Sequence, residues 1–482
     1  MIGPRLGCIA DDYTGATDLS SMLVRAGLRV VQLFGSFASI DKMSSELLNA
    51  IAETDAVVIA LKSRSIPSAD AVEVSLKALQ VLHCLGAERV FFKYCSTFDS
   101  TATGNIGPVA EALASALHQS SVWYCPAFPE NGRTVYRGYL FVNGVPLHES
   151  GMKDHPLNPM TDSNLVRWLQ PQCENKVGLV NLATVRSCDV VKQEGFEEKN
   201  WIVDAVDDED LVRIAELACN EILLTGGSAI CGQWAKVLIK SGPMAPATGF
   251  DSATLGPLVP ENSACGSGEI IAPEASAYGS GEIIPSSAQG LRTFAERKAT
   301  MTVILAGSCS VATRHQIGAF ADSGGPVLPL DILASARDGD SFKRVIDEAV
   351  SWCQEHAHYP ASLIASAESD EAVSIPSLEL GPKSAALLTE SLFAAIAHEL
   401  VSLGVRRLIV AGGETSGAVI NSLKIDAVKI GREIAPGVPW VHSVRPPYLS
   451  LVLKSGNFGD KYFFQDAIEC IDEQATTSEH KL

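Results

Sequence analysis

Length, composition and charge set the first limits on this chain. Its 482 residues exceed one ordinary domain, and a hydrophobic fraction of 46% with 6% aromatic residues is typical of a soluble α/β protein of two domains. The formal net charge of −19 argues against nucleic acid or an anionic membrane as the main partner. It does not exclude an anionic small ligand, because a local group of Lys and Arg can oppose the global charge.

Cysteine usage and the N-terminus indicate a reducing compartment. The twelve cysteines are scattered, with no CxxC pair and no Cys/His metal spacing, and Cys8, Cys95 and Cys353 lie beside apolar runs. We therefore expect reduced thiols in the core. The first residues contain no apolar stretch of signal-peptide length, and no run approaches about 18 apolar residues, so we expect no membrane span and a cytoplasmic protein.

The first half of the chain alternates short apolar runs with helical patterns. Strands are predicted at 6–10, 29–34, 55–61, 90–92, 122–125, 178–180 and 201–203. Helices are predicted after the first strand, through Leu19, Leu23 and Val24, and over 69–85. Strands that alternate with helices predict a mainly parallel sheet with right-handed crossovers.

The second half repeats this pattern after a change of composition. From about residue 248 to 289 the sequence is rich in Gly, Ser, Pro and Ala, and GSGEII occurs twice, at 266–271 and 279–284. Further strands are predicted at 301–305, 326–330, 361–366 and 407–411. We therefore predict an N-terminal domain at 1–247, a linker or surface insert at 248–294 and a C-terminal domain at 295–482, each domain with a mainly parallel sheet flanked by helices.

A polar segment at 93–108, KYCSTFDSTATGNIGP, follows a short apolar run and has neither helical nor strand periodicity. Polar, glycine-bearing loops after core strands are where α/β proteins usually place their ligand chemistry. Lys93, and Arg64 after another predicted strand, are candidates to bind an anion such as a carboxylate. Asp99 is a candidate to orient or deprotonate a hydroxyl. The alternative is a solvated loop with an exposed arginine nearby.

Two adjacent carboxylates, Asp11 and Asp12, follow the first predicted strand and open a helix. At the carboxyl end of a strand, such a pair suits hydroxyl binding or proton abstraction. The alternative is an N-cap, since an aspartate there satisfies free helix amides. One aspartate can cap a helix, but two adjacent ones are harder to explain in that way. Asp18 lies one to two turns further along.

Three turns of glycine and hydroxyl residues occur in the second half. The segment 412–418, GGETSGA, lies between a predicted strand and a predicted helix, a layout that presents amides and a helix dipole to phosphate. The other two turns are GSCS at 307–310 and KSGNFG at 454–459. None is a Walker A loop or a GxGxxG fingerprint, which weakens a dehydrogenase interpretation. Together they fit a nucleotide site, and no residues have the spacing of a metal site.

These motifs together resemble the four-carbon acid sugar kinases, over nearly the whole chain outside the Gly/Ser-rich segment. The matching motifs are ADDYTGATD at 10–18, KYCSTFDSTATGNIGPV at 93–109, CPAFPENGRTVYRGYLFVNGVPL at 125–147, HPLNPMTDSNL at 155–165, GSCSVAT at 307–313, GGETSGAV at 412–419 and KSGNFG at 454–459. The resemblance implies ATP-dependent phosphorylation, with Mg²⁺, of the terminal hydroxyl of a four-carbon acid sugar. It also implies an active site in a cleft between an acid-sugar domain and a nucleotide domain.

The resemblance further implies roles for particular residues. On the acid-sugar side these are the expected catalytic carboxylates Asp12 and Asp99 and the expected substrate-binding residues Asp11, Arg64, Lys93, Ser96 and Thr97. On the nucleotide side they are Ser308, Ser310, Gly412, Gly413, Glu414, Thr415, Gly456 and Asn457. The family often has aspartate where this chain has Glu414, so the metal ligand stays open. The segment 266–281 looks longer than the family's usual connection and has no assigned function.

Alternatives remain for the substrate and for the class of function. The long central motifs favour 3-oxo-tetronate as the acceptor, whereas D-threonate and D-erythronate lack its keto group and are too similar to be separated by sequence. A catalytically silent sugar-acid sensor would keep the two-domain cleft and release no ADP. The sequence predicts no nucleic-acid or membrane partner, and it leaves a homodimer open.

Overall fold

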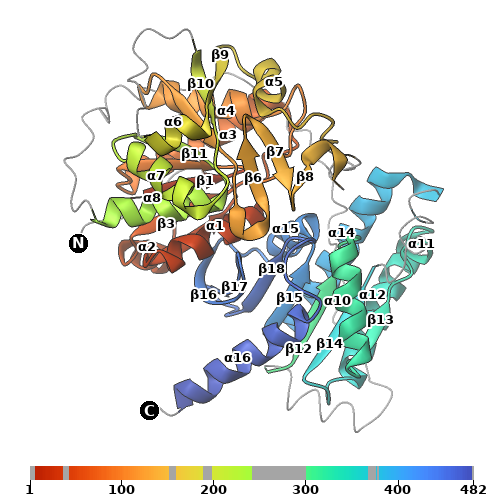
Figure 1. Ribbon diagram of the computed structural model, residues 1–482. Coiled ribbons are helices and arrows are strands. Elements are labelled where there is room, and N and C mark those ends of the chain that lie inside the picture. The colour runs from red at the N-terminus through yellow and green to blue at the C-terminus, as the bar shows by residue number, and fades with distance from the viewer. Residues whose placement is uncertain are drawn as a thin grey trace, which may run out of the picture.

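The computed structural model describes residues 6–35, 43–150, 153, 159–187, 198–240, 300–366, 376 and 379–479. Within these ranges, fifteen strands form one large sheet with helices packed on its faces, and three more form a small second sheet (Figure 1). The predicted linker or insert at 248–294, with both GSGEII repeats, lies outside the described residues. The domain division at 1–247 and 295–482 therefore stays a prediction.

The N-terminal part of the large sheet consists of eight parallel strands. In spatial order they are β2 (Val30–Phe34), β3 (Ala56–Ala60), β1 (Leu6–Ala10), β4 (Arg89–Lys93), β11 (Leu223–Gly226), β5 (Val122–Cys125), β10 (Glu198–Val203) and β9 (Lys176–Val180). The helices of this part are α1 (Tyr13–Arg25), α2 (Ser45–Ala52), α3 (Ser68–Cys84), α4 (Ile106–Ala116), α5 (Leu165–Leu169), α6 (Leu182–Ser187), α7 (Asp208–Leu217) and α8 (Ser228–Lys240). Strands β1 and β3 are buried over their whole length, which is why their sequences are continuous apolar runs without alternation.

The C-terminal part of the sheet has five parallel strands followed by two antiparallel ones. In spatial order they are β13 (Val327–Pro329), β14 (Ala361–Ala365), β12 (Thr302–Ala306), β15 (Arg407–Ala411), β18 (Ser450–Lys454), β17 (Val438–Ser443) and β16 (Ala427–Ala435). The helices of this part are α10 (Val311–Asp322), α11 (Ile332–Ser335), α12 (Gly339–Glu355), α14 (Pro382–Ser402), α15 (Gly413–Ser422) and α16 (Phe463–Glu479). This part therefore has the expected mainly parallel sheet flanked by helices, with the antiparallel hairpin of β16 and β17 added.

The two parts of the sheet join edge to edge, whereas the sequence analysis expected a separate sheet in each domain. Strand β16 pairs antiparallel with β2, with Ala427 opposite Leu33 and Lys429 opposite Val31. Each of these strands would otherwise present unpaired N–H and C=O groups at the edge of its own sheet. The pairing satisfies both edges and makes one continuous structure (Figure 1). We call this β2–β16 pairing the seam.

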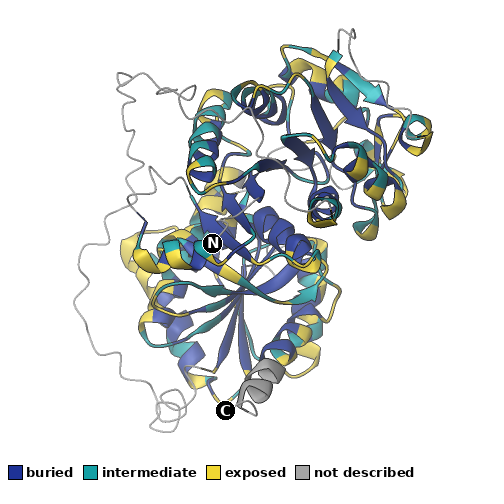
Figure 2. Ribbon diagram, turned by 90° about the vertical axis from the view of Figure 1, so that its left-hand side faces the viewer, coloured by how far each residue is buried: buried dark blue, intermediate teal, exposed yellow. Residues whose placement is uncertain are grey.

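Burial follows the layers of the fold. In Figure 2 the central strands are buried and the exposed residues lie on the outer faces of the flanking helices. The described cysteines are all free thiols. Cys8 and Cys353 are buried, as expected, whereas Cys95 is only partly buried and Cys84 and Cys309 are exposed. The small antiparallel sheet of β6 (Arg133–Tyr136), β7 (Tyr139–Val142) and β8 (Val145–Pro146) was not predicted.

One described helix is long and apolar enough, by length and composition alone, to cross a membrane. It is the segment Lys383–Ser402 of α14, which no simple run of apolar residues had revealed. Its residues Leu392, Phe393 and Ile396 are fully buried in the protein, and α14 packs on α15. Only 39% of this apolar window is buried in the protein, and a single such helix is weak evidence for a membrane span.

The strand order determines which loops can meet. Strands β3, β1 and β4 are neighbours and parallel, so their carboxyl ends lie along one edge of the sheet. Strands β12, β15 and β18 are likewise parallel neighbours. All candidate site residues follow these six strands, so the fold gathers them into two loop clusters.

Candidate active site

The first cluster lies at the carboxyl ends of β3, β1 and β4. Ala10, at the end of β1, is in register with Ala60 of β3 and with Lys93 of β4. The backbone joins the loops that follow: the Asp11 amide donates to the Lys93 carbonyl at 3.1 Å, and the Arg64 amide donates to the Asp11 carbonyl at 3.2 Å. Polar residues that are up to 82 positions apart in the chain thus share one small region.

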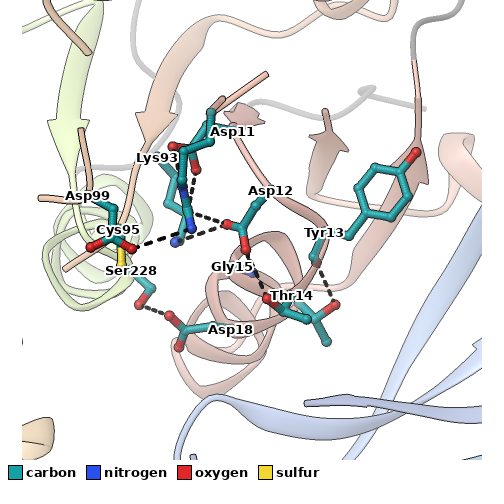
Figure 3. A network of polar contacts seen from close by, with 12 residues as sticks. Asp11, Asp12, Tyr13, Thr14, Gly15, Asp18, Lys93, Cys95, Asp99 and Ser228 are labelled. Atoms are coloured by element: carbon teal, nitrogen blue, oxygen red, sulfur yellow. Dashed lines mark hydrogen bonds and ion pairs between the residues drawn. The ribbon is translucent and has the colours of Figure 1, made fainter. Parts of the chain in front are cut away.

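Three carboxylates surround the Arg64 guanidinium. Arg64 holds Asp11 in a bidentate pair, with Nε to Oδ2 at 2.9 Å and Nη2 to Oδ1 at 2.7 Å. Nη2 also donates to Asp12 Oδ1 at 2.6 Å, and Nη1 lies 3.9 Å from Asp99 Oδ2. Figure 3 shows the carboxylates of Asp11, Asp12 and Asp99 around the same cationic groups. The planar five-donor fork of arginine suits this geometry, which a lysine could not reproduce.

Lys93 adds a second cation that is only 3% exposed. Its Nζ lies 3.9 Å from Asp12 Oδ1 and next to Gly15 in the first turn of α1. A Cβ placed on Gly15 would lie 2.3 Å from this Nζ and 2.1 Å from Asp12 Oδ1. Only glycine therefore leaves room at this position for the lysine to approach the carboxylate.

Asp12 caps helix α1 and also belongs to the cation cluster. Its backbone is extended, with φ −146°, and its Oδ2 accepts from the Gly15 amide at 3.1 Å and from Thr14 Oγ1 at 2.9 Å. Its Oδ1 is left for Arg64 and Lys93. The capping interpretation is therefore confirmed, and it leaves the other oxygen of the same carboxylate for the functional role that the sequence analysis expected.

Opposing effects set the ionisation of the cluster. Burial raises the pKa of Asp12, but the charges of Arg64 and Lys93 more than offset this and lower its pKa to about 2. Burial also raises the pKa of Asp11, and the bidentate Arg64 opposes the rise only in part. Burial lowers the pKa of Arg64, but Asp11 and Asp12 together raise it well above its usual value. Asp12 is thus an ionised acceptor at neutral pH.

The polar loop after β4 is shorter than the segment 93–108 that the sequence indicated. Lys93 ends β4 and α4 begins at Ile106, so the loop itself spans 94–105. Thr97 Oγ1 donates to Asp99 Oδ1 at 2.8 Å and holds that carboxylate in place. Ser96 is partly buried in the same loop.

Asn105 has a role that the sequence analysis missed. Its Nδ2 donates to the carbonyls of Ser63, Arg64 and Ile66 at 2.6, 3.3 and 2.9 Å. The polar loop therefore clamps the loop that carries Arg64. An asparagine directly before a helix is usually read as an N-cap, but this side chain makes no capping bond to α4.

Asp18 is a fourth carboxylate, and it lies further along the chain than Asp12, within helix α1. Its Oδ2 accepts from Ser228 Oγ at 2.5 Å, while its Oδ1 is buried and has no hydrogen-bond partner among the described residues (Figure 3). Burial raises the pKa of Asp18 to about 6, although the charge of Lys93 and the bond from Ser228 oppose the shift. A Cβ on Gly437, in the turn between β16 and β17, would lie 2.3 Å from Oδ1.

The second cluster lies at the carboxyl ends of β12, β15 and β18. The Gly307 and Ser308 amides donate to the Ala411 carbonyl at 3.0 Å each, and the Gly412 amide donates to the Lys454 carbonyl at 2.8 Å. The three glycine turns of the sequence analysis therefore lie side by side. A Cβ on Gly456 would lie 2.3 Å from Ser308 Oγ, so the turns are in close contact.

The turn at 412–415 opens helix α15 without a side-chain cap. Gly412 has φ +134°, a conformation that side chains rarely permit, and no side chain bonds to the first-turn amides of α15. Gly413 begins the helix and Glu414, in its first turn, is 61% exposed at the side chain. Thr415 is buried against Gly307. Uncapped amides at a helix N-terminus favour an anion such as phosphate.

The third glycine turn is braced by hydroxyls. Ser310 caps α10, accepting from the Thr313 amide at 3.2 Å, and also donates to the Gly456 carbonyl at 2.7 Å. Thr313 Oγ1 donates to the same carbonyl at 2.9 Å. Asn457, the next residue, is exposed. The hydroxyl of Ser310 thus has internal partners, whereas Asn457 faces solvent.

The two clusters approach each other across the packing of α1 on α15. Lys62 Nζ lies 3.2 Å from Glu414 Oε2, and Tyr13 Oη donates to Asn421 Oδ1 at 3.2 Å. A Cβ on Gly413 would lie 3.6 Å from Thr14 Oγ1, so residues next to Asp12 contact the start of α15. The loops that the resemblance assigns to acid sugar and to nucleotide are therefore neighbours. Lys62 was not among the candidate residues of the sequence analysis.

Comparison with known proteins shows which family this chain resembles. A family model described as a sugar-binding N-terminal domain matches residues 6–233, and one described as a nucleotide-binding C-terminal domain matches residues 303–464. A protein of Burkholderia multivorans named 3-oxo-tetronate kinase is 42% identical, with 98% of each chain covered. A protein of the same name from Cupriavidus necator is 42% identical, with 96% of each chain covered.

Solved structures show the same fold. One from Salmonella typhimurium LT2, described as a putative tRNA synthase, is 35% identical with a TM-score of 0.73 over 96% of this chain and 98% of its own. One from Haemophilus influenzae is 35% identical with a TM-score of 0.66 over the same shares. Fold and site thus define a phosphotransferase that joins a sugar-binding part to a nucleotide-binding part. More particularly, the chain belongs to the four-carbon acid sugar kinase family.

Proposed function

We propose that this kinase transfers the γ-phosphate of ATP to the 4-hydroxyl of 3-oxo-tetronate. The observation that carries the proposal is the approach of the two clusters. A buried lysine and a partly buried arginine lie among carboxylates, near the uncapped first-turn amides of α15, which follows β15. The relatives that match along the whole chain carry the name of this activity.

The acid-sugar cluster offers complementary groups for each end of the substrate. Arg64 and Lys93 would bind the substrate carboxylate, since both are cationic and nearly buried. Asp11 would keep Arg64 in position through its bidentate pair. Thr97 would orient Asp99, and Ser96 would be free to bind a substrate hydroxyl or carbonyl.

Asp12 would accept the proton of the 4-hydroxyl. Its pKa of about 2 in the free protein makes it a weak base, but Arg64 and Lys93 are the cause of that low value. A substrate carboxylate that binds these two cations would draw them away from Asp12 and raise its pKa. Phosphoryl transfer through a loose transition state asks chiefly for positioning, so the proton can move late. Asp99 is the second candidate for this role.

The nucleotide cluster would hold the phosphates of ATP. The uncapped first turn of α15, from Gly413 to Thr415, and the turn at Gly456 would present backbone donors. The Ser308 amide already donates to the Ala411 carbonyl, so Ser308 would contribute its hydroxyl. Closure over both substrates would exclude water and protect ATP from hydrolysis. Asn457 and the turn at Gly412 would contact the same phosphates of ATP.

Mg²⁺ would arrive with the nucleotide, since it binds through phosphates, waters and one or two carboxylates. Within the described ranges, no group of three or more His, Cys, Asp or Glu side chains forms a ready metal site. Glu414 is the carboxylate on the glycine turn, and its exposed side chain fits a single contact to such a metal. The metal would supply charge neutralisation on the phosphates.

A coupled assay of ADP release across four-carbon acids tests the proposal. We expect turnover with 3-oxo-tetronate and at least about tenfold lower kcat/KM with D-threonate and D-erythronate. The reverse order would make the enzyme a tetronate kinase. Acid binding without ADP release from any substrate would make it a sensor and overturn the proposal.

Substituting Asp12→Asn tests the catalytic role. Asparagine caps a helix about as well as aspartate, so the start of α1 should keep its structure. We expect kcat to fall by about 10² to 10⁴. The melting temperature should fall as well, because a carboxylate whose pKa is lowered to about 2 stabilises the folded state at neutral pH. Asp99→Asn is the matched comparison, and the larger loss of kcat identifies the base. Wild-type turnover in Asp12→Asn would exclude Asp12.

Two further points belong to this proposal. We place the enzyme in the cytoplasm, where ATP is abundant and thiols stay reduced. We also expect its working partners to be the acid sugar and ATP, with a homodimer as one assembly to be tested by light scattering.

A further inference from the structure

Lys454, the last residue of β18, is completely buried and belongs to neither set of candidate residues. Its Nζ donates to the Ser455 carbonyl at 2.9 Å, to the Gly456 carbonyl at 3.0 Å and, more weakly, to Thr313 Oγ1 at 3.4 Å. No described carboxylate pairs with it. A buried ammonium without a counter-ion is costly, so its presence needs an explanation.

The ammonium determines the direction of two peptide planes. In a trans peptide the C=O and the following N–H point in opposite directions. The carbonyls of Ser455 and Gly456 point to Lys454, and that of Gly456 also accepts from Ser310 and Thr313. The amides of Gly456 and Asn457 must therefore point away from the lysine, out of the turn. Neither amide donates to an acceptor among the described residues.

Adjacent amides that point the same way form an anion-binding concavity. The turn at Ser308 is in direct contact with Gly456, and the uncapped start of α15 follows the adjoining strand β15. Two outward amides thus lie beside the other donors of the nucleotide cluster, with a buried positive charge directly behind them.

We propose that Lys454 is the positioning residue of the nucleotide site, which aims the Gly456 and Asn457 amides at the phosphates of the bound nucleotide and supplies the positive charge behind them. The inference rests on the proposed function of this cluster. It accounts for a buried cation with no counter-ion: the nucleotide itself is the missing anion. It also makes Ser310 and Thr313 parts of the same brace.

The groups that face the ammonium are neutral on every side. They are the hydroxyl of Thr313 from α10, the carbonyls of the turn after β18, and the ring of Phe463 from α16, which lies 5.8 Å from Nζ. Burial accordingly lowers the pKa of Lys454 to about 7.

The test is Lys454→Met, with ATP and ADP affinities measured by calorimetry and folding checked by thermal unfolding without nucleotide. We expect Kd for ATP to rise at least about tenfold, since bonds that serve a charged ligand are lost. KM for the acid sugar should change less than about twofold. The melting temperature should hold or rise, because a buried unpaired charge is replaced by an apolar chain of similar length.

A merely structural lysine predicts the opposite pattern, with a lower melting temperature and unchanged Kd in the folded fraction, and that result would overturn the inference. Thr313→Val is the matched control: it removes one hydroxyl from the same brace, keeps the charge, and should raise Kd less than Lys454→Met does. A wild-type protein that binds no nucleotide would instead reject the proposed function.

The wild-type protein offers a measurement that needs no variant. Between pH 7.5 and 9 the phosphates of ATP are already ionised, while Lys454 loses its proton in the free protein. We therefore expect Kd for ATP to rise with pH, by up to about tenfold per unit. A Kd that is constant or falls over this range contradicts the inference even if Lys454→Met does not fold.

Discussion

A single carboxylate can cap a helix with one oxygen and face cations with the other, as Asp12 does. Its Oδ2 accepts from the start of α1, and its Oδ1 faces the cations Arg64 and Lys93. Sequence analysis treated capping and function as alternatives, because a sequence pattern describes whole residues. The structure shows that the two oxygens of the carboxylate have different partners. The resemblance grouped Asp11, Arg64 and Lys93, and the structure brings them together because each lies at the end of a core strand.

Burial explains the residues that sequence reasoning missed. Lys454 lies in a motif that was recognised, but nothing in KSGNFG shows that its first side chain is enclosed. Asn105 lies where an N-cap is expected and instead clamps a loop 39 to 42 residues earlier in the chain. Such roles depend on tertiary contacts, which local patterns do not contain.

Asp18 gives a pH-dependent prediction at this scale. Its pKa is raised to about 6 in the folded protein, above its ordinary value of 3.8. The folded state therefore binds a proton more tightly than the unfolded chain does, so stability is lost as pH rises from about 4 to 6. Asp18→Asn should remove this penalty and stabilise the protein at pH 7.5 by on the order of 2 kcal/mol.

Thermal unfolding of both proteins at pH 4 and at pH 7.5 provides the measurement. The bond from Ser228 should survive in the variant, since an amide oxygen accepts it equally well. A stabilisation that is the same at both pH values would mean that ionisation of Asp18 is not its cause.

At the scale of helices and strands, the candidate site residues lie on turns at the ends of parallel strands. Strands β12, β15 and β18 were foreseen only in part: the first two are continuous apolar runs, whereas β18 follows an unpredicted hairpin. In strand β16 only the first two residues, Ala427 and Val428, are buried, and the rest of the strand carries charges, so it does not resemble a core strand. Strand β11 has only four residues, and its burial comes from β4 and β5 on either side.

Gly412 allows the turn before α15, and its replacement tests that turn. At φ +134° an alanine is strained, and its Cβ would also lie 3.0 Å from Thr415 Oγ1. We expect Gly412→Ala to lower the free energy of unfolding by about 1 to 3 kcal/mol and to raise KM for ATP. Denaturant unfolding and steady-state kinetics measure these effects.

Gly318→Ala serves as the matched control. Gly318 lies inside α10 with open space at its Cβ and no positive φ. Alanine there should stabilise the helix by up to about 1 kcal/mol and leave KM unchanged. Equal losses in the two variants would show that the backbone of Gly412 has no special role.

At the scale of the whole molecule, the seam makes one sheet from two functional parts. The pairing of β2 with β16 and the packing of α1 on α15 link the sugar-binding and nucleotide-binding parts. Sequence analysis foresaw the two α/β patterns but not their union, because strand pairing between distant segments leaves no local trace. Parts that share a sheet cannot unfold independently without exposing a strand edge.

We therefore expect a single cooperative transition in scanning calorimetry, with calorimetric and van't Hoff enthalpies in agreement. Saturating ADP should shift the whole transition upward, by an amount set by its concentration over Kd. Two transitions, of which nucleotide moves only one, would show that the seam does not couple the parts.

The seam also dictates an order of events during synthesis. Its two strands lie about 390 residues apart, so at roughly 5 to 20 residues per second the ribosome delivers β16 about 20 to 80 seconds after β2. Throughout that interval the nascent N-terminal part has an open strand edge with no native partner, and such edges attract other chains. Synthesis of β16 is thus what covers the open edge of β2.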